Sequence, residues 1–226
     1  MRKTIIAITL LPLFGITPTW AQSGDDFVVE TKSNVVKLGP KVGIGFTSMT
    51  QPNEIDLYDK AGTGFSFGLS VKTRFGRATA ETAQGGTGFL GFGLDVLYKQ
   101  NKAKTIGEQN LAIDYLEFPL TLQFYPMARS SVMNSFFIEA GPDFALIASK
   151  SPDVLEVPSA NIAYHTGDFK GGDVRLVAGL GYTLPKTGLG INARYYIGTS
   201  KLAGNFPCKM STFEISLAWM FNVAKF

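Results

Sequence analysis

The segment "LGFGLDVLY" (residues 90–98) alternates bulky apolar side chains with small or acidic ones. Successive side chains of an extended strand point to opposite faces, so the segment predicts a β-strand with two chemically different faces. The bulky face carries Leu90, Phe92, Leu94, Val96 and Tyr98. The other face carries Gly91, Gly93 and Asp95, and Leu97 is its one bulky residue.

The same period of two recurs along the chain and predicts an all-β fold. Eight segments show it: 42–48, 65–75, 90–98, 116–124, 136–148, 174–184, 189–197 and 213–221. The bulky register is free of charged residues in every segment, and all of the charges and glycines of these segments lie in the complementary register. Eight is an even number of strands, so an antiparallel arrangement brings both ends of the chain to the same side.

Side-chain volume decides which face points outward. An eight-stranded soluble barrel of the lipocalin kind would put the apolar face inside, but an interior of that size has room only for modest side chains or one small ligand. The many Phe, Tyr, Leu and Ile side chains do not fit there, whereas glycines and a few charges do. A continuous apolar exterior is stable only in lipid. We therefore predict an eight-stranded antiparallel transmembrane up-and-down β-barrel.

The N-terminus predicts export. Arg2 and Lys3 precede an apolar run, and Thr19-Trp20-Ala21 is a plausible cleavage site. An N-terminal membrane anchor is the alternative, but the run is shorter than the ~20 residues that a spanning helix needs. We expect a cleaved signal peptide (1–21), a periplasmic leader (22–37) and an outer-membrane barrel (38–226), with the outer membrane of a Gram-negative-type cell as the location.

Composition excludes several functions. The 226 residues include one Cys and one His, so a disulfide framework, a zinc site and a histidine-rich metal centre are excluded. Removing Arg2 and Lys3 lowers the formal net charge from +3 to +1, which leaves no electrostatic argument for a nucleic-acid partner. His165 and Asp168 lack a nucleophile on a rigid element, so we expect no enzyme, no cofactor and no metal.

The charges of the glycine-rich register form the candidate site. They are Lys72, Arg74, Asp95, Glu117, Glu139, Asp143, Arg175, Arg194 and Glu214. An unpaired charge in a narrow lumen is strongly unfavourable, so these residues are expected to pair. The favoured interpretation is a salt-bridged plug that fixes the barrel and blocks flow. The alternative is a small solute or ion pore that uses the same groups.

Connections between the strands suggest where partners bind. The expected outer loops are 50–63, 100–111, 150–172 and 199–211, and the expected inner turns are 76–88, 126–134 and 185–188. The longest outer loop offers Tyr164, His165 and Phe169 as possible contacts to a protein partner of the envelope or of a secretion system. Outer-membrane lipid is the other expected partner.

Several motifs resemble the PorT-type family of outer-membrane β-barrels. They are "YLEFPLTLQFYP" (115–126), "FFIEAGPDFALI" (136–147), "GDVRLVAGLGYTL" (172–184) and "FEISLAWMF" (213–221). The resemblance covers roughly residues 38–226 and implies a small outer-membrane barrel more than any activity. Because some members of that family are linked to protein secretion, it also implies a secretion- or envelope-associated role.

Overall fold

The computed structural model describes residues 34–50, 58–75, 88–105, 110–130, 132–157, 162–184, 187–203 and 208–225. The expected signal peptide (1–21) and most of the expected leader (22–37) lie outside these residues. The strands are β1 (Val35–Thr50), β2 (Tyr58–Arg74), β3 (Leu90–Thr105), β4 (Asn110–Phe124), β5 (Phe136–Ser151), β6 (Val154–Val157), β7 (Ile162–His165), β8 (Gly172–Thr183), β9 (Leu189–Gly198), β10 (Lys209–Trp219) and β11 (Phe221–Lys225). A 3₁₀ turn, η1 (Thr166–Asp168), follows β7. No helix in the described ranges is long and apolar enough to cross a membrane.

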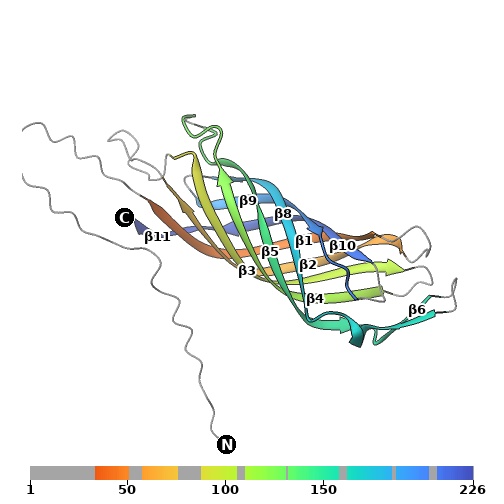
Figure 1. The fold of residues 1–226 in the computed structure, drawn as a ribbon. Helices are drawn as coiled ribbons and strands as arrows, with labels where there is room; N and C mark the ends of the chain where they lie inside the picture. The colour runs from red at the N-terminus through yellow and green to blue at the C-terminus, as the bar shows by residue number, and fades with distance from the viewer. Residues whose placement is uncertain are drawn as a thin grey trace, which may run out of the picture.

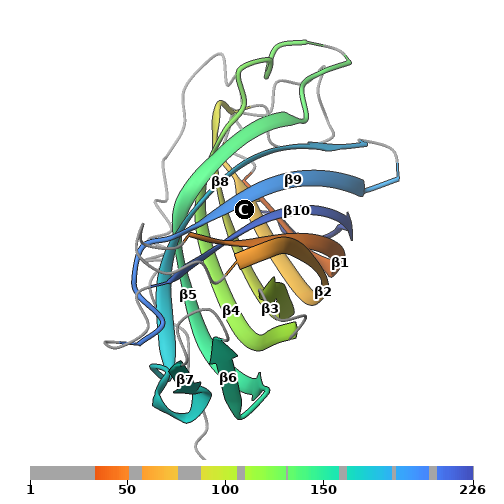
Figure 2. The same cartoon turned by 90° about the vertical axis from the view of Figure 1, so that its right-hand side faces the viewer.

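Eight antiparallel strands close into a barrel. Their order is β10-β9-β8-β5-β4-β3-β2-β1, and a further pairing of β1 with β10 completes the ring (Figures 1 and 2). β11 continues β10 beyond Met220 and pairs with the start of β1, where Val35 lies opposite Lys225. Since every neighbouring pair is antiparallel and joined in chain order, the predicted up-and-down topology is confirmed.

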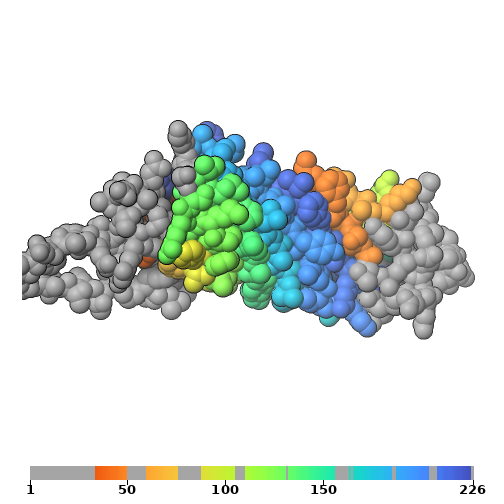
Figure 3. All heavy atoms as spheres, turned by 90° about the horizontal axis from the view of Figure 1, so that it is seen from above, coloured from red at the N-terminus to blue at the C-terminus, as the bar shows by residue number. Residues whose placement is uncertain are grey.

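The two faces of each strand are oriented as predicted. Phe67, Leu122 and Leu217 are 50%, 54% and 47% exposed, whereas Glu117 and Arg175 are almost fully buried. Figure 3 shows the outer wall from one side, where side chains of successive strands form adjoining bands along the barrel. A wall of this kind is apolar over most of its length, and exposure to lipid rather than to water makes it stable.

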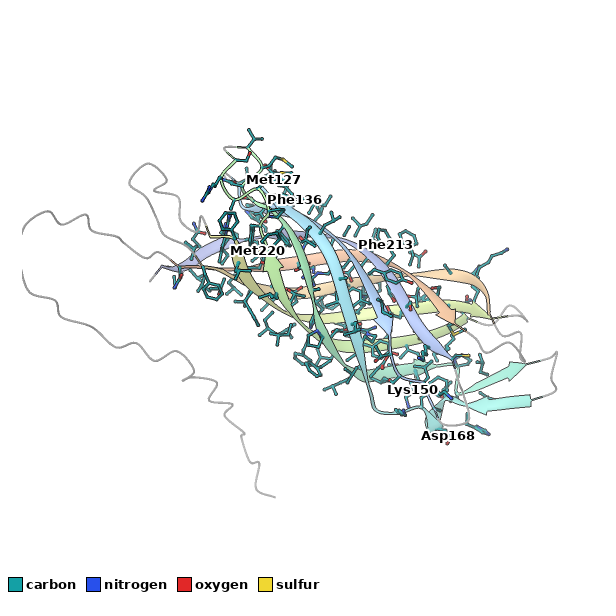
Figure 4. The ribbon with its side chains drawn as sticks, turned by 45° about the horizontal axis from the view of Figure 1, so that its top comes forward. Met127, Phe136, Lys150, Asp168, Phe213 and Met220 are labelled. Carbon is teal, nitrogen blue, oxygen red and sulfur yellow. The ribbon has the colours of Figure 1, made fainter. Side chains whose placement is uncertain are left out.

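The two ends of the barrel differ. Both described ends of the chain lie at one end, together with the turn that carries Met127 and with Phe136 and Met220 (Figure 4). We call it the inner end, because small outer-membrane barrels direct their chain ends and short turns to the periplasm. Lys150 and Asp168 lie at the opposite, outer end.

The strands extend farther at the outer end than the sequence suggested. β2 begins at Tyr58, β3 runs to Thr105 and β4 begins at Asn110, so much of the expected loops 50–63 and 100–111 is strand. The expected loop 150–172 contains the β6–β7 hairpin and η1, which project beyond the ring in Figures 1 and 2. The β-ladder continues past the apolar band because the inward side chains at this end pack together over the mouth of the barrel.

Candidate functional site

The lumen is crossed by a single chain of ion pairs in which the sign of the charge alternates. Nine buried side chains take part, in the order Glu139, Arg194, Asp95, Lys41, Glu214, Lys99, Glu117, Arg175 and Asp143. They come from β1, β3, β4, β5, β8, β9 and β10. Inward positions of almost every strand are therefore tied together across the axis.

The first half of the chain centres on Arg194. Its Nε lies 2.6 Å from Oε1 of Glu139, and its Nη1 contacts Asp95. Asp95 in turn accepts a hydrogen bond of 2.9 Å from Lys41 Nζ. Glu139 also accepts hydrogen bonds from Thr121, Gln123 and Asn192, at 3.0, 3.0 and 3.3 Å. The lone pairs of Glu139 are thus largely satisfied by protein groups.

The second half of the chain centres on Lys99 and Arg175. Lys99 Nζ lies 2.9 Å from Glu214 and 3.5 Å from Glu117. Arg175 contacts both Glu117 and Asp143, and its Nε donates to Asp143 at 2.9 Å. Lys41 lies 3.9 Å from Glu214 and so joins the two halves. Each carboxylate in the middle of the chain has two cationic neighbours, as a buried charge requires.

Aromatic rings fill the space around these charges. Lys99 Nζ lies 3.2 Å from the centre of the Tyr196 ring, and the Arg175 guanidinium lies between the rings of Tyr115 and Tyr196, at 5.1 and 5.3 Å. Such cation–π contacts add to the ion pairs when both groups are desolvated. At Gly181, an added Cβ would lie 2.4 Å from the Phe137 ring. This glycine therefore makes room for an aromatic side chain inside the barrel.

Tyr125 and Phe137 pack together at the inner end of the lumen, with ring centres 5.5 Å apart. Lys72 lies over the Phe137 ring at 4.3 Å and Arg74 over the Tyr125 ring at 4.0 Å. Arg74 also donates to backbone carbonyls of the flanking segments, those of Gly88 and Asn134, both at 2.8 Å.

The expectation that all nine predicted charges pair with one another is wrong for Lys72 and Arg74. Neither has a carboxylate within 4 Å among the described residues. Arg74 is near the rim and only half-buried, so backbone carbonyls and an aromatic ring are closer to it than the acids of the lumen. The other seven predicted charges are brought together in the alternating chain.

The outer end of the lumen is covered by an apolar cluster, which we call the outer cap. Its members are Met49, Ala103, Leu111, Ile113, Tyr115, Ala145, Leu155, Phe169, Leu202, Ala203, Cys208 and Met210. Strand ends supply most of them, and the rest are Leu155 of β6, Phe169, Leu202, Ala203 and Cys208. Two backbone hydrogen bonds, from Lys170 to Leu202 and from Leu202 to Cys208, hold these segments to each other.

The predicted partner-contact residues differ in position. His165 is exposed beside η1, and the side chain of Tyr164 lies outside the described part of the structure. Phe169 is only 4% exposed and belongs to the outer cap, so the structure does not present it to a partner. Its carbonyl accepts a hydrogen bond of 2.9 Å from Lys150. Burial also raises the pKa of the nearby Cys208 thiol to about 11, so this thiol is protonated at neutral pH.

Sequence reasoning missed two central members of the ion-pair chain. Lys41 and Lys99 lie just beyond the segments in which the apolar pattern was counted, yet both share the inward parity of their strands. Extending the inward register by two to four positions, from Gly43 to Lys41 and from Asp95 to Lys99, would have found them. In the described residues no group of three or more His, Cys, Asp or Glu is arranged to hold a metal ion.

A closed eight-stranded barrel with an apolar exterior and a polar interior defines an outer-membrane β-barrel protein. The chain belongs to the family described as outer membrane protein beta-barrel domain, which matches residues 20–204. The protein is therefore an outer-membrane protein of a Gram-negative-type cell, as the sequence predicted. A comparison with curated proteins gives no match.

Three solved structures are similar to this chain at low sequence identity. Neisserial surface protein A (NspA) has a TM-score of 0.44 and 10% identity, covering 81% of this chain and 97% of its own. The attachment invasion locus protein Ail of Yersinia pestis has a TM-score of 0.42 and 13% identity, covering 82% and 98%. OprG from Pseudomonas aeruginosa has a TM-score of 0.36 and 13% identity, covering 86% and 98%.

Proposed function

We propose that this protein is a structural or interaction barrel of the outer membrane with a closed lumen, and not a pore. The observation that carries the proposal is the alternating ion-pair chain. It spans the lumen between the Tyr125–Phe137 pair at the inner end and the outer cap at the outer end. Water and ions would have to pass the Tyr125–Phe137 pair, the buried charges and the outer cap in turn. Together, the side chains of these layers come from most strands of the barrel.

Energetics favour a plug over a conducting path. An ion that enters this lumen competes with charges that already have partners within 3.9 Å. Conduction needs sites that bind ions weakly enough to release them. Separating one of these pairs leaves an uncompensated buried charge, which costs about 3–5 kcal/mol. The same cost makes the ion pairs a device that fixes the register and shape of the barrel.

Conductance tests the closed lumen. The purified protein in planar bilayers should show no steady nanosiemens-scale channels, because an ion would have to displace packed side chains of the described residues in all three layers. A variant carrying Tyr115→Gly and Tyr196→Gly, which removes the rings around Arg175, is the matched control and should show an increased background leak. Steady open channels in the wild-type protein would end the plug proposal and favour the pore.

We propose that the protein acts through its outer surface, by contact with a protein partner of the envelope or of a secretion system. The β6–β7 hairpin supports this role, because it is paired only with itself and projects beyond the barrel (Figures 1 and 2). His165 and Ala163 are exposed on β7. The resemblance to PorT-type proteins favours a secretion-associated partner. No catalytic role is proposed.

Site-specific crosslinking tests this contact. A photoreactive amino acid at Ala163 or His165 should give a reproducible crosslinked species in intact cells, and the partner should copurify in detergent. The matched control is Val132, which is 67% exposed at the inner end of the barrel. If Ala163 and His165 give no product, or the same products as Val132, the hairpin is not the contact surface.

A further inference from the structure

Three lysines gather on the outer wall near the outer end, on the face opposite to the lumen. Lys60 on β2 and Lys104 on β3 are directly opposite in the ladder, and both are exposed. Lys102 precedes Lys104 by two residues and so shares its face. Like charges opposite each other destabilise a sheet. Among the described residues no carboxylate lies within 4 Å of any of the three amines. The three lysines thus give this part of the wall a positive charge.

The wall is hollowed beside these lysines. A depression of about 450 Å³ is lined by Lys102 and Lys104 together with the small residues Thr63, Asn110 and Ala112. Ala112 lies opposite Lys102 in the β3–β4 ladder, and Asn110 lies opposite Lys104. Short side chains next to long ones leave space on the sheet surface. The volume falls in the range of sites that hold small ligands.

An aromatic cluster lies on the membrane side of the depression. Phe65 and Phe67 on β2 and Tyr98 on β3 pack together, with centres 5.3 Å apart for Phe67 and Tyr98 and 6.2 Å apart for Phe65 and Phe67. Exposed aromatic rings mark the membrane interface of a barrel. Lys102 is four residues beyond Tyr98 on the same outward face, about 13 Å along the strand. The lysines therefore lie where lipid headgroups begin.

We propose that the outer ends of β2, β3 and β4 bind the phosphorylated headgroup of a glycolipid of the outer leaflet. Lys60, Lys102 and Lys104 contact the phosphate, and the acyl chains lie along Phe65, Phe67 and the apolar wall below them. A lipid would contact both the lysines and the aromatic cluster, through its headgroup and its acyl chains. A free phosphate ion would contact the lysines alone. The contact is separate from the hairpin and from the lumen, so it does not depend on the function proposed above.

Binding of diphosphorylated lipid A to the purified full-length protein in detergent, followed by native mass spectrometry, tests the proposal. The variant Lys102→Gln with Lys104→Gln should bind at least tenfold more weakly than wild type. Lys170→Gln with Lys201→Gln is the matched control, because both lysines are exposed at the same end but outside the depression; it should change binding less than twofold. Gel mobility of unheated samples verifies that each variant is folded.

The same preparation tests whether the lysines bind a lipid headgroup or a free phosphate ion. Dephosphorylated lipid should bind the wild-type protein as weakly as diphosphorylated lipid binds the Lys102 and Lys104 variant. Inorganic phosphate at millimolar concentration should leave lipid binding unchanged. The proposal is overturned if the variant keeps wild-type affinity, if dephosphorylated lipid binds equally well, or if inorganic phosphate displaces the lipid.

Discussion

Replacing Arg194 by leucine is expected to destabilise the folded barrel by about 3–5 kcal/mol, because it leaves the buried carboxylate of Glu139 without a cationic partner. Arg194 is the only group whose ion pairs join Glu139 to Asp95 among the described residues. Asp95 keeps Lys41 as a partner, but Glu139 is left with neutral hydrogen-bond donors. Equilibrium unfolding in urea, with the protein in lipid vesicles, measures the loss.

The double variant Arg194→Leu with Glu139→Leu is the control for this loss. It removes a cation and an anion together, so the lumen keeps its net charge and no carboxylate is stranded. Buried ion pairs are often replaced by apolar groups at little cost, and the double variant should therefore recover most of the stability. If Arg194→Leu alone unfolds within about 1 kcal/mol of wild type, the ion pairs do not hold the barrel together.

The fold could be predicted from the sequence because the side chains of a strand alternate between two faces. In lipid the apolar face points outward and the polar face inward, the reverse of a water-soluble barrel. Phe67, Leu122 and Leu217 were placed outside by volume alone, and they are among the exposed side chains of the structure. The same parity placed Glu117 and Arg175 in the lumen. These predictions needed only the direction of each side chain, which the position in a strand determines.

The partners within the lumen could not be predicted in the same way. Which carboxylate contacts which cation depends on the stagger between strands, and stagger is set by the ladder rather than by one strand's pattern. Lys41 reaches Asp95 across 54 residues of sequence. The outer cap was missed for a related reason: Leu111 and Ile113 have inward parity, but only the closed ring shows that they meet Phe169 over the mouth.

Replacing Leu217 by arginine is expected to destabilise the barrel by about 2–4 kcal/mol when it is folded in a bilayer. Leu217 lies midway along the outward apolar positions from Phe213 to Phe221 and is 47% exposed. Its neighbours in the adjoining strands are Val42 and Ile191, which are also exposed. A guanidinium at this position has no polar partner and lies in the hydrocarbon. Urea titration of vesicle-embedded protein gives the difference in unfolding free energy.

The matched control is the same substitution at Gln100, which also points outward but lies near the outer end of β3. Gln100 is opposite Asp114 in the β3–β4 ladder, so an arginine there gains an acidic neighbour at the headgroup level. Arginine near the interface costs only about 0–1 kcal/mol, and Gln100→Arg should therefore remain close to wild type. Equal effects of the two substitutions would contradict the placement of the apolar band in the membrane core. A large loss confined to Leu217→Arg ties the alternating pattern of the sequence directly to the lipid that surrounds it.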